Sequence, residues 1–260
     1  MALRTPPRTG AAETSATVLY CYGVTSAETA KSQRSAGLGG KPVEPVRFGD
    51  LAALTSPVPP GKVRARRADL LSHFDVLGTA FEDGTVIPLR FGIVFEDDAS
   101  LVEEFLKPRH DELGGLLREL RDRVELRVTA HYREDAILAE IVRESRRVAR
   151  LREATQTQAA QPLLLELGEL VAAELQARTV RDRRMIVERL RPLALAYELD
   201  EEPIEHQVLR GSFLVEQGRL AAFDEAMEDL ASGQAGRIDF KYVGPLPPHS
   251  FVGLEHEGRR

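Results

Sequence analysis

Hydrophobic and polar positions along the chain follow two different periods, and their order predicts a mixed fold. Apolar residues alternate with polar ones at 124–132, the period of two that is typical of a strand with one solvent-facing side. Strand-like runs also occur at 207–216 and 237–243, and a short amphipathic helix separates them. Between these strands, residues 134–200 follow helical spacing almost throughout, with a polar break at TQTQAAQ that predicts an antiparallel helical pair. The fold class indicated is α+β.

The N-terminal half carries the pattern of a second sheet. The run TVLYCYGV at 17–24 is continuously apolar, which predicts a strand buried on both faces. Two short apolar runs divided by Gly49 and Asp50 predict a β-hairpin. Residues 65–82 follow helical spacing and are expected to pack one face on the sheet. An extended run follows, in which Pro88 implies a sheet edge or a bulge.

A length of 260 residues agrees with two domains. The expected divisions are a disordered tail at 1–16, an N-terminal α+β domain at 17–122, a C-terminal α+β domain at 123–243 that contains the helical region 134–200, and a C-terminal segment at 244–260 that packs back on the body.

Composition narrows the class of protein. Cys21 is the only cysteine, so we expect no intrachain disulfide and a reducing, cytoplasmic compartment. The N-terminus lacks the apolar segment of a secretory signal, and no apolar run is long enough for a membrane helix. A net charge of -6 argues against a general nucleic-acid binder, because such binding depends on a basic surface.

The sequence lacks the common catalytic motifs. Around Gly61 and Lys62 a phosphate-binding loop would need a glycine where Ser56 stands and a hydroxyl where Val63 stands. No GxGxxG, HExxH or GxSxG sequence occurs. The six histidines are scattered, and surface or helix-cap positions are expected for them. We therefore expect no catalytic residue, no metal site and no cofactor.

Charged clusters have simple structural explanations. Ser100 and Glu103 have the spacing of a capping box, and the acids at 96–98 suit a helix N-terminus. The basic run at 62–67 lacks interleaved aromatic residues, which favours a solvated loop over a nucleic-acid site. Arg90 stands among apolar residues, so it is expected either to form an internal ion pair or to be held for a partner.

Several local sequences, taken in order, resemble one protein family. They are a first strand ending in YGV, His73 with Val76 and Leu77 on the first helix, VIPLRFGIVF at 86–95, the strand VELRVTA, FLV at 213–215 and GPLPPHSFV at 244–252. Together they resemble the gas vesicle protein F/L family (GvpF/GvpL) from about residue 17 to 252. Whether the chain is F-like or L-like stays open.

The resemblance implies a non-enzymatic accessory or minor structural protein of gas vesicles, the hollow protein-walled organelles that give buoyancy. It also implies two α+β domains, of which the second is a modified ferredoxin-like fold with an inserted helical pair. The implied partners are the small, hydrophobic, GvpA-like shell protein, bound during nucleation and wall growth, and other gas vesicle accessory proteins. Neither nucleic acid nor membrane is an implied partner. The implied location is the gas vesicle or the cytoplasm.

The family does not supply a residue-level site. Candidate partner contacts are therefore taken from the apolar faces of two predicted helices and from the Arg-Phe-Gly sequence: Arg90, Phe91, Leu70, Phe74, Leu163 and Leu167. Two other functions remain open. A small-ligand-binding ferredoxin-like regulatory module would show a rise in melting temperature with its ligand. A nucleic-acid binder using 62–67 and 178–184 would show co-purified nucleic acid and steep salt dependence.

Overall fold

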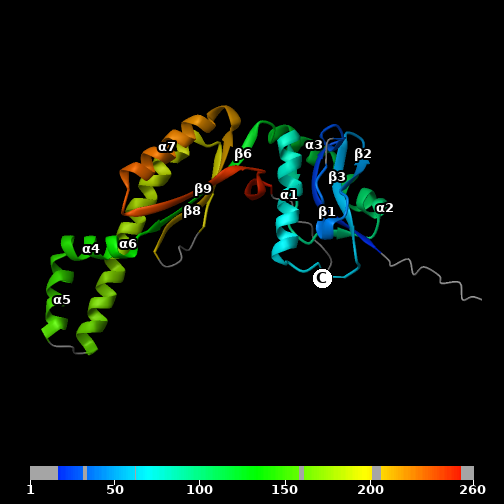
Figure 1. Ribbon diagram of the computed structural model, residues 1–260. Coiled ribbons are helices and arrows are strands. Elements are labelled where there is room, and N and C mark those ends of the chain that lie inside the picture. The colour runs from blue at the N-terminus through cyan, green and yellow to red at the C-terminus, as the bar shows by residue number, and fades with distance from the viewer. Residues whose placement is uncertain (1–16, 32–33, 62, 158–160, 201–205, 253–260) are drawn as a thin grey trace, which may run out of the picture. The chain divides into compact units, whose positions relative to one another are not determined.

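The computed structural model describes residues 17–31, 34–61, 63–157, 161–200 and 206–252 (Figure 1). The chain divides into two compact units, the first ending at Glu119 and the second beginning at Leu120. Each unit combines helices with its own antiparallel sheet, so the predicted α+β class is confirmed. The predicted tail at 1–16, and the last part of the predicted C-terminal segment from residue 253, lie outside the described residues.

The sheet of the first unit has the order β2-β3-β1-β4, with β5 also paired to β1. Its strands are β1 (Val18–Ser26), β2 (Glu44–Phe48), β3 (Leu51–Val58), β4 (Val86–Pro88) and β5 (Val94–Phe95). The predicted hairpin is confirmed, because β2 and β3 pair through a turn in which Gly49 has a φ of 60°. Strand β1 is central and buried on both faces, as its sequence predicts. Pro88 lies in the edge strand β4, where its missing N–H costs no ladder bond.

Helices cover both faces of this first sheet. Helix α1 (Arg67–Asp83) packs on one face, where Ala52 and Leu54 of β3 belong to its apolar cluster. On the other face lie α2 (Asp98–Leu101), a π-helical turn (Val102–Leu106) and α3 (His110–Glu119).

The start of α2 differs from the predicted capping box. Asp97 is the N-cap: its carboxylate accepts a hydrogen bond from the Ser100 amide at 2.8 Å. The Ser100 hydroxyl in turn accepts from the Asp97 amide at 3.0 Å. The predicted box of Ser100 with Glu103 is therefore wrong, because the carboxylate of Asp97 reaches the first unpaired amides of the helix one turn earlier.

The sheet of the second unit has the order β7-β8-β6-β9, and every pairing is antiparallel. Its strands are β6 (Arg123–Tyr132), β7 (Ala196–Leu199), β8 (Gln207–Glu216) and β9 (Ile238–Leu246). Its helices are α4 (Glu134–Glu144), α5 (Arg146–Thr157), α6 (Gln161–Leu190) and α7 (Leu220–Gly233). The order of strands and helices is the β-α-β-β-α-β order of ferredoxin-like folds, with α4, α5 and α6 in the first crossover.

The predicted helical region 134–200 needs two corrections. It holds three helices rather than two, because Ser145 leaves the helical conformation at φ -94° and ψ 101°. Residues 196–199 are strand β7, which pairs with β8. The last strand also continues to Leu246, beyond the predicted end at 243, and its shifted register opposite β6 accommodates Pro245 at the sheet edge.

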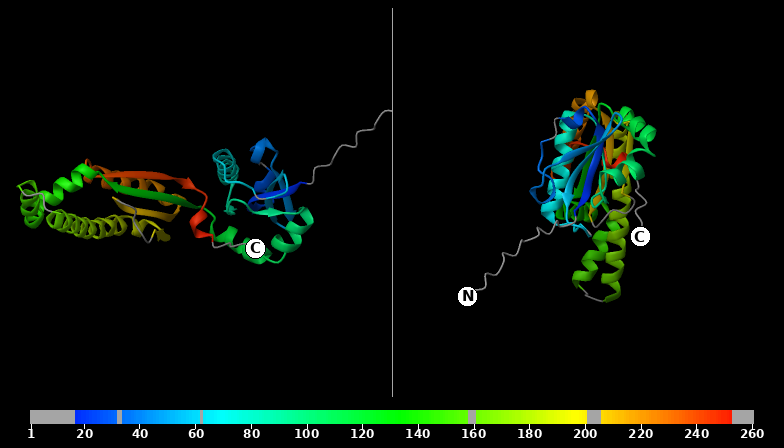
Figure 2. Two further views of the ribbon diagram at one scale, coloured as in Figure 1. Left: turned by 90° about the horizontal axis from the view of Figure 1, so that it is seen from below. Right: turned by 90° about the vertical axis from the view of Figure 1, so that its right-hand side faces the viewer.

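Helix α5 and the first half of α6 form the predicted antiparallel pair. Together they extend past the end of the sheet in the second unit (Figures 1 and 2). The second half of α6 packs along β8 and against α7, which itself packs on β9. One helix therefore belongs both to the core of the unit and to the projecting hairpin.

Gly23→Ala tests how closely β4 and α1 approach β1. A Cβ atom at Gly23 would lie 2.6 Å from the carbonyl oxygen of Ile87 and 2.9 Å from Cδ2 of Leu77. We expect the free energy of unfolding, measured by urea denaturation, to fall by about 2 kcal/mol. In the control Gly78→Ala, the added Cβ meets no atom of the described chain within 4 Å. The higher helix propensity of alanine should raise the free energy of unfolding of this control by up to about 1 kcal/mol. Equal stability of the two variants would contradict the prediction.

Candidate functional site

Exposed apolar side chains gather on α1 and beside it in the first unit. Leu71 is 59% exposed and Phe74 is 48% exposed, and their spacing of three residues places them on the same side of the helix. Val94 of β5 is also exposed, and Phe91 is half-buried. We call Leu71, Phe74, Phe91 and Val94 the α1–β5 surface.

A buried histidine holds this surface together. The Nδ1 atom of His73 lies 2.8 Å from the hydroxyl of Tyr20, and that hydroxyl accepts a hydrogen bond from the Gly92 amide at 3.2 Å. The rings of Phe74 and Phe91 pack edge-on against the imidazole, with centroid distances of 5.5 and 5.6 Å. Burial raises the pKa of Tyr20 well above its ordinary value, so its hydroxyl stays protonated. The turn that carries Phe91 is thereby fixed to α1 through β1.

His73 itself corrects the sequence analysis, which placed the histidines at surface or cap positions. Its side chain is 1% exposed. The signal was present in the sequence, because His73 shares one helix face with the buried residues Val76, Leu77 and Ala80 at spacings of three, four and seven.

A hollow of about 510 Å³ adjoins the α1–β5 surface. It is lined by Gly61, Val63, Arg64, Ala65, Phe91, Gly92 and Val94. The hollow thus brings the basic run at 62–67 next to the Arg-Phe-Gly sequence, although Lys62 lies outside the described residues. Its lining is largely apolar and includes the exposed Arg64, so it can receive an apolar side chain of a partner that has an acidic neighbour.

The six predicted contact residues fall into two groups. Leu70, Phe74, Arg90 and Phe91 lie in the first unit, and Leu163 and Leu167 lie half-buried on α6 in the second. Arg90, which was expected either to form an internal ion pair or to be held for a partner, has an exposed side chain.

Leu71 was missed, although it is more exposed than the half-buried Leu70. One residue along a helix rotates the side chain by about 100°, and here that step moves it away from the core. Val94 was missed as well; it lies in the two-residue strand β5, where Val94 is exposed and Phe95 is buried.

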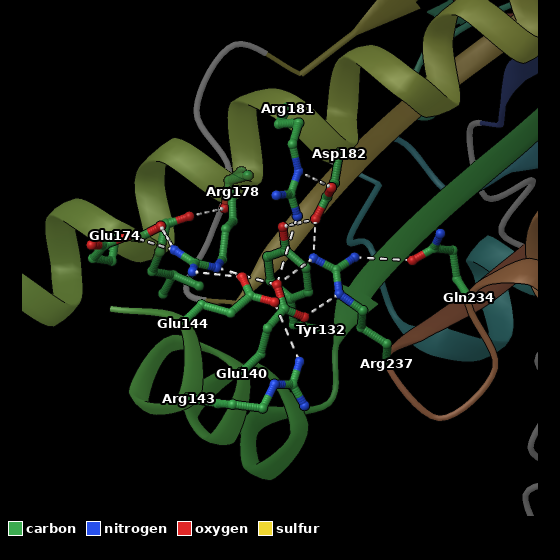
Figure 3. Close-up of polar contacts among 12 residues, drawn as sticks. Tyr132, Glu140, Arg143, Glu144, Glu174, Arg178, Arg181, Asp182, Gln234 and Arg237 are labelled. Atoms are coloured by element: carbon green, nitrogen blue, oxygen red, sulfur yellow. Dashed lines mark hydrogen bonds and ion pairs between the residues drawn. The ribbon is translucent and has the colours of Figure 1, made fainter. Parts of the chain in front are cut away.

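A large cluster of charged side chains lies in the second unit, where α6 meets α4 and the start of β9 (Figure 3). Arg178 of α6 is only 8% exposed. It donates to the carboxylates of three glutamates: Glu140 at 3.2 Å, Glu144 at 3.1 Å and Glu174 at 2.6 Å. Such a cluster is costly to bury unless every charge has a partner, and here each of these acids does.

Arg237 joins the same cluster from the other side. It donates to both oxygens of Glu140 and, at 2.6 Å, to Asp182. The hydroxyl of Tyr132, at the end of β6, donates to the same Asp182 oxygen at 2.6 Å.

The hydrogen bond from Arg237 holds the pKa of Glu140 below its ordinary value, against the effect of burial. Burial would raise the pKa of Asp182, but the bonds from Arg181, Tyr132 and Arg237 lower it overall. Both acids therefore stay ionised at neutral pH, and the cluster joins the projecting hairpin to the sheet.

The ion pairs of α6 also bear on the hypothesis that the basic run at 178–184 binds nucleic acid. Arg178 is buried in the cluster, Arg181 pairs with Asp182 at 3.0 Å, and Arg184 pairs with Glu188 at 2.7 Å. Arg183 donates instead to the backbone carbonyl of Asp200 at 2.7 Å. Three of the four arginines in this run are thus paired with acids of the chain, which counts against a phosphate-binding surface here.

The sequence GPLPPHSFV at 244–252 provides hydrogen-bond donors for a second buried carboxylate, that of Glu125. Glu125 of β6 has a fully buried side chain and accepts bonds from Arg127 at 2.7 Å and from the hydroxyl of Ser212 at 3.0 Å. Ser250 adds its amide at 2.7 Å and its hydroxyl at 2.9 Å. Next to it, burial lowers the pKa of His249 to about 4.

Chemistry suited to catalysis is sparse in the described part of the chain. Burial raises the pKa of the Cys21 thiol to about 12, so it stays protonated and unreactive. No group of three or more His, Cys, Asp or Glu side chains in the described residues is placed to hold a metal ion. Within the same residues, no helix combines the length and the apolar character needed to cross a membrane.

Glu140→Gln tests the ion-pair cluster. The substitution leaves Arg178 and Arg237 partly uncompensated in a buried site, so we expect the free energy of unfolding at pH 7 to fall by about 3 kcal/mol. Glu188→Gln on α6, the helix that carries Arg178, is the control, because its pair with Arg184 is exposed and should contribute less than about 0.5 kcal/mol. Chemical denaturation of both variants measures the difference, and a similar small loss in both would refute the structural role.

His249→Gln tests the half-buried imidazole and its lowered pKa. Because the pKa is lowered in the folded chain, protonation favours the unfolded chain: stability is complete above the ordinary pKa of about 6.5 and declines as the pH falls toward 4. In the native chain, this imidazole should lower the free energy of unfolding by about 2 kcal/mol as the pH falls across that interval. In the variant, this pH-dependent decrease should be absent. The measurement is a series of denaturation curves from pH 7 to pH 4. If the free energy of unfolding changed with pH in the same way in the variant and the native chain, the prediction would be wrong.

Comparison with known proteins gives one consistent result. Residues 18–253 match the family model described as "Gas vesicle synthesis protein GvpL/GvpF". The gas vesicle protein F of Streptomyces sp. (strain CB03234) is 34% identical over 239 residues, which cover 90% of this chain and 98% of that protein. The gas vesicle protein L of the same strain is 27% identical over 267 residues, covering 92% and 94%.

Two solved structures share the fold. The crystal structure of GvpF from Anabaena sp. PCC7120 has a TM-score of 0.80 at 23% identity and covers 92% of this chain and 100% of that one. The GvpF structure from Microcystis aeruginosa has a TM-score of 0.72 at 20% identity, covering 91% and 99%. With a family model that spans nearly the whole described chain and a relative above 30% identity, the protein belongs to the gas vesicle synthesis protein GvpL/GvpF family.

Proposed function

We propose that this chain binds the small hydrophobic shell protein of the gas vesicle and assists its nucleation and assembly. Family membership supports a role connected with gas vesicles. The observation that carries the binding role is the α1–β5 surface, where Leu71 and Phe74 are 59% and 48% exposed beside a hollow with a largely apolar lining. Exposed apolar groups of this size, gathered in one place and rimmed by charge, are typical of protein interaction sites.

A shell subunit with a free apolar face would aggregate in water. A partner that covers this face until the subunit joins the wall would keep it soluble. The α1–β5 surface suits that role because His73, Tyr20 and Gly92 fix its parts before binding, so little side-chain and loop entropy is lost on contact. Arg64 in the lining of the hollow would favour a shell segment that carries an acidic residue. The proposed place of action is the cytoplasm and the growing vesicle wall.

In this proposal Phe74 and Phe91 are direct contacts, and Leu70 and Arg90 lie at the margin of the surface. Leu163 and Leu167 are half-buried on α6 in the other unit, so they are not needed for this site. Other accessory proteins of the gas vesicle remain alternative partners.

The combined substitution Leu71→Ser and Phe74→Ser tests the proposal. Both side chains are exposed, so the fold should survive, and we expect at least a tenfold loss of shell-protein binding because each buried apolar contact is worth about 1 to 2 kcal/mol. The measurement is co-expression with the shell protein, scoring both co-elution and the soluble fraction of shell protein.

Leu164→Ser with Leu165→Ser is the matched control, because these leucines are 51% and 66% exposed in the second unit. Retained binding in the control and loss in the first variant supports the α1–β5 surface. Loss only in the control would move the shell site to α6. Without co-elution by the native, folded chain, the shell-binding proposal fails, and a role through other accessory partners would be examined next.

A further inference from the structure

The hairpin formed by α5 and residues 161–177 of α6, which we call the arm, has almost no core of its own. Among its described residues only Val148 is buried, while Leu164 and Leu165 are more than half exposed. Helices of this length are marginal in water unless an amphipathic face packs on another surface. The arm therefore presents apolar side chains that a second surface would cover.

The two helices of the arm carry opposite charge. Helix α5 has four arginines and one glutamate, and residues 161–177 have three glutamates and neither lysine nor arginine. Arg147 and Glu166 form an ion pair across the hairpin at 3.2 Å. A hollow of about 560 Å³ on α5 is lined by three arginines together with Leu151 and Ala154; the arginines are Arg146, Arg147 and Arg150.

We propose that the arm pairs with the arm of a second copy of this chain, with α5 of each copy lying along α6 of the other. A two-fold arrangement of this kind makes one four-helix bundle from two incomplete hairpins. It places the arginines of each α5, Arg150 above all, near Glu166 and Glu169 of the second copy. Charge complementarity identifies the partner as a second copy of the chain. The arm is basic along α5 and acidic along α6, so a two-fold rotation places the basic helix of one copy against the acidic helix of the other.

A second copy of the chain fits the charges of the arm better than an anionic membrane does. Glu166 and Glu169 are both exposed on the leucine-bearing helix and would be repelled by anionic lipid headgroups. Two helices on each side bury a small area compared with a standard interface, so the pairing is weak and depends on concentration. It does not depend on the proposed shell-protein site, which lies in the other unit.

Analytical ultracentrifugation of the full chain from about 1 μM to about 500 μM tests the pairing. The expected result is a monomer at the low end and a dimer at the high end. Arg150→Glu and Glu169→Arg should each raise the dissociation constant about tenfold or more, because each puts like charges together twice in a two-fold dimer. An equimolar mixture of the two variants should recover dimerisation, since both contacts then join opposite charges.

Glu228→Arg, an exposed charge reversal on α7, is the control and should leave the dimer unchanged. Circular dichroism checks that all variants retain their helices. A native chain that stays monomeric throughout the range overturns the proposal, even if it still binds the shell protein. Single variants that dimerise like the native chain, or a mixture that does not recover, overturn it as well.

Discussion

The geometry of the second unit depends on one shared acid. Glu140 of α4 accepts hydrogen bonds from Arg178 of α6 and from Arg237 beside β9, so three segments of the chain meet at a single carboxylate. Apolar packing alone would allow a helix to rotate or slide by small amounts with little change in energy. A buried charge allows no such freedom, because losing one partner leaves the other uncompensated. The direction of α6 relative to the sheet follows from this constraint.

The first unit fixes its exposed elements through the protonated hydroxyl of one tyrosine. Tyr20 lies in the central strand, contacts His73 of α1 through its hydroxyl, and accepts the amide of Gly92. Aromatic rings fill the space around these atoms. A neutral group of this kind avoids the cost of burying charge, and it keeps the apolar side chains above it in one arrangement. The two units thus hold their outward-facing parts by different means.

The sequence predicted those elements that depend on residues close together in the chain. Strand β8 was predicted with its observed ends, and the β2–β3 hairpin followed from its turn residues. Strand β7 was missed because four residues carry no period of their own and become a strand only by pairing with β8.

The ion-pair cluster was equally hidden, since Arg237 and Glu140 lie 97 residues apart and each looks like an ordinary surface charge in the sequence. Among the candidate contacts, Phe74 was chosen from an apolar helix face and Phe91 from an unusual motif, and their role in binding stays a prediction. The burial of His73 was not recognised, because its partner Tyr20 comes from a distant strand.

Helix α6 runs without interruption for 30 residues, about 45 Å at the usual rise per residue. Only its C-terminal half is held by the sheet and the charged cluster, so about 25 Å of stiff helix stands beyond Arg178. A rod fixed at one end acts as a spacer. Whatever attaches near Leu164 is held at a set distance from the sheet, and a pull at that point is carried along the helix axis to Glu140 instead of being absorbed by a flexible linker.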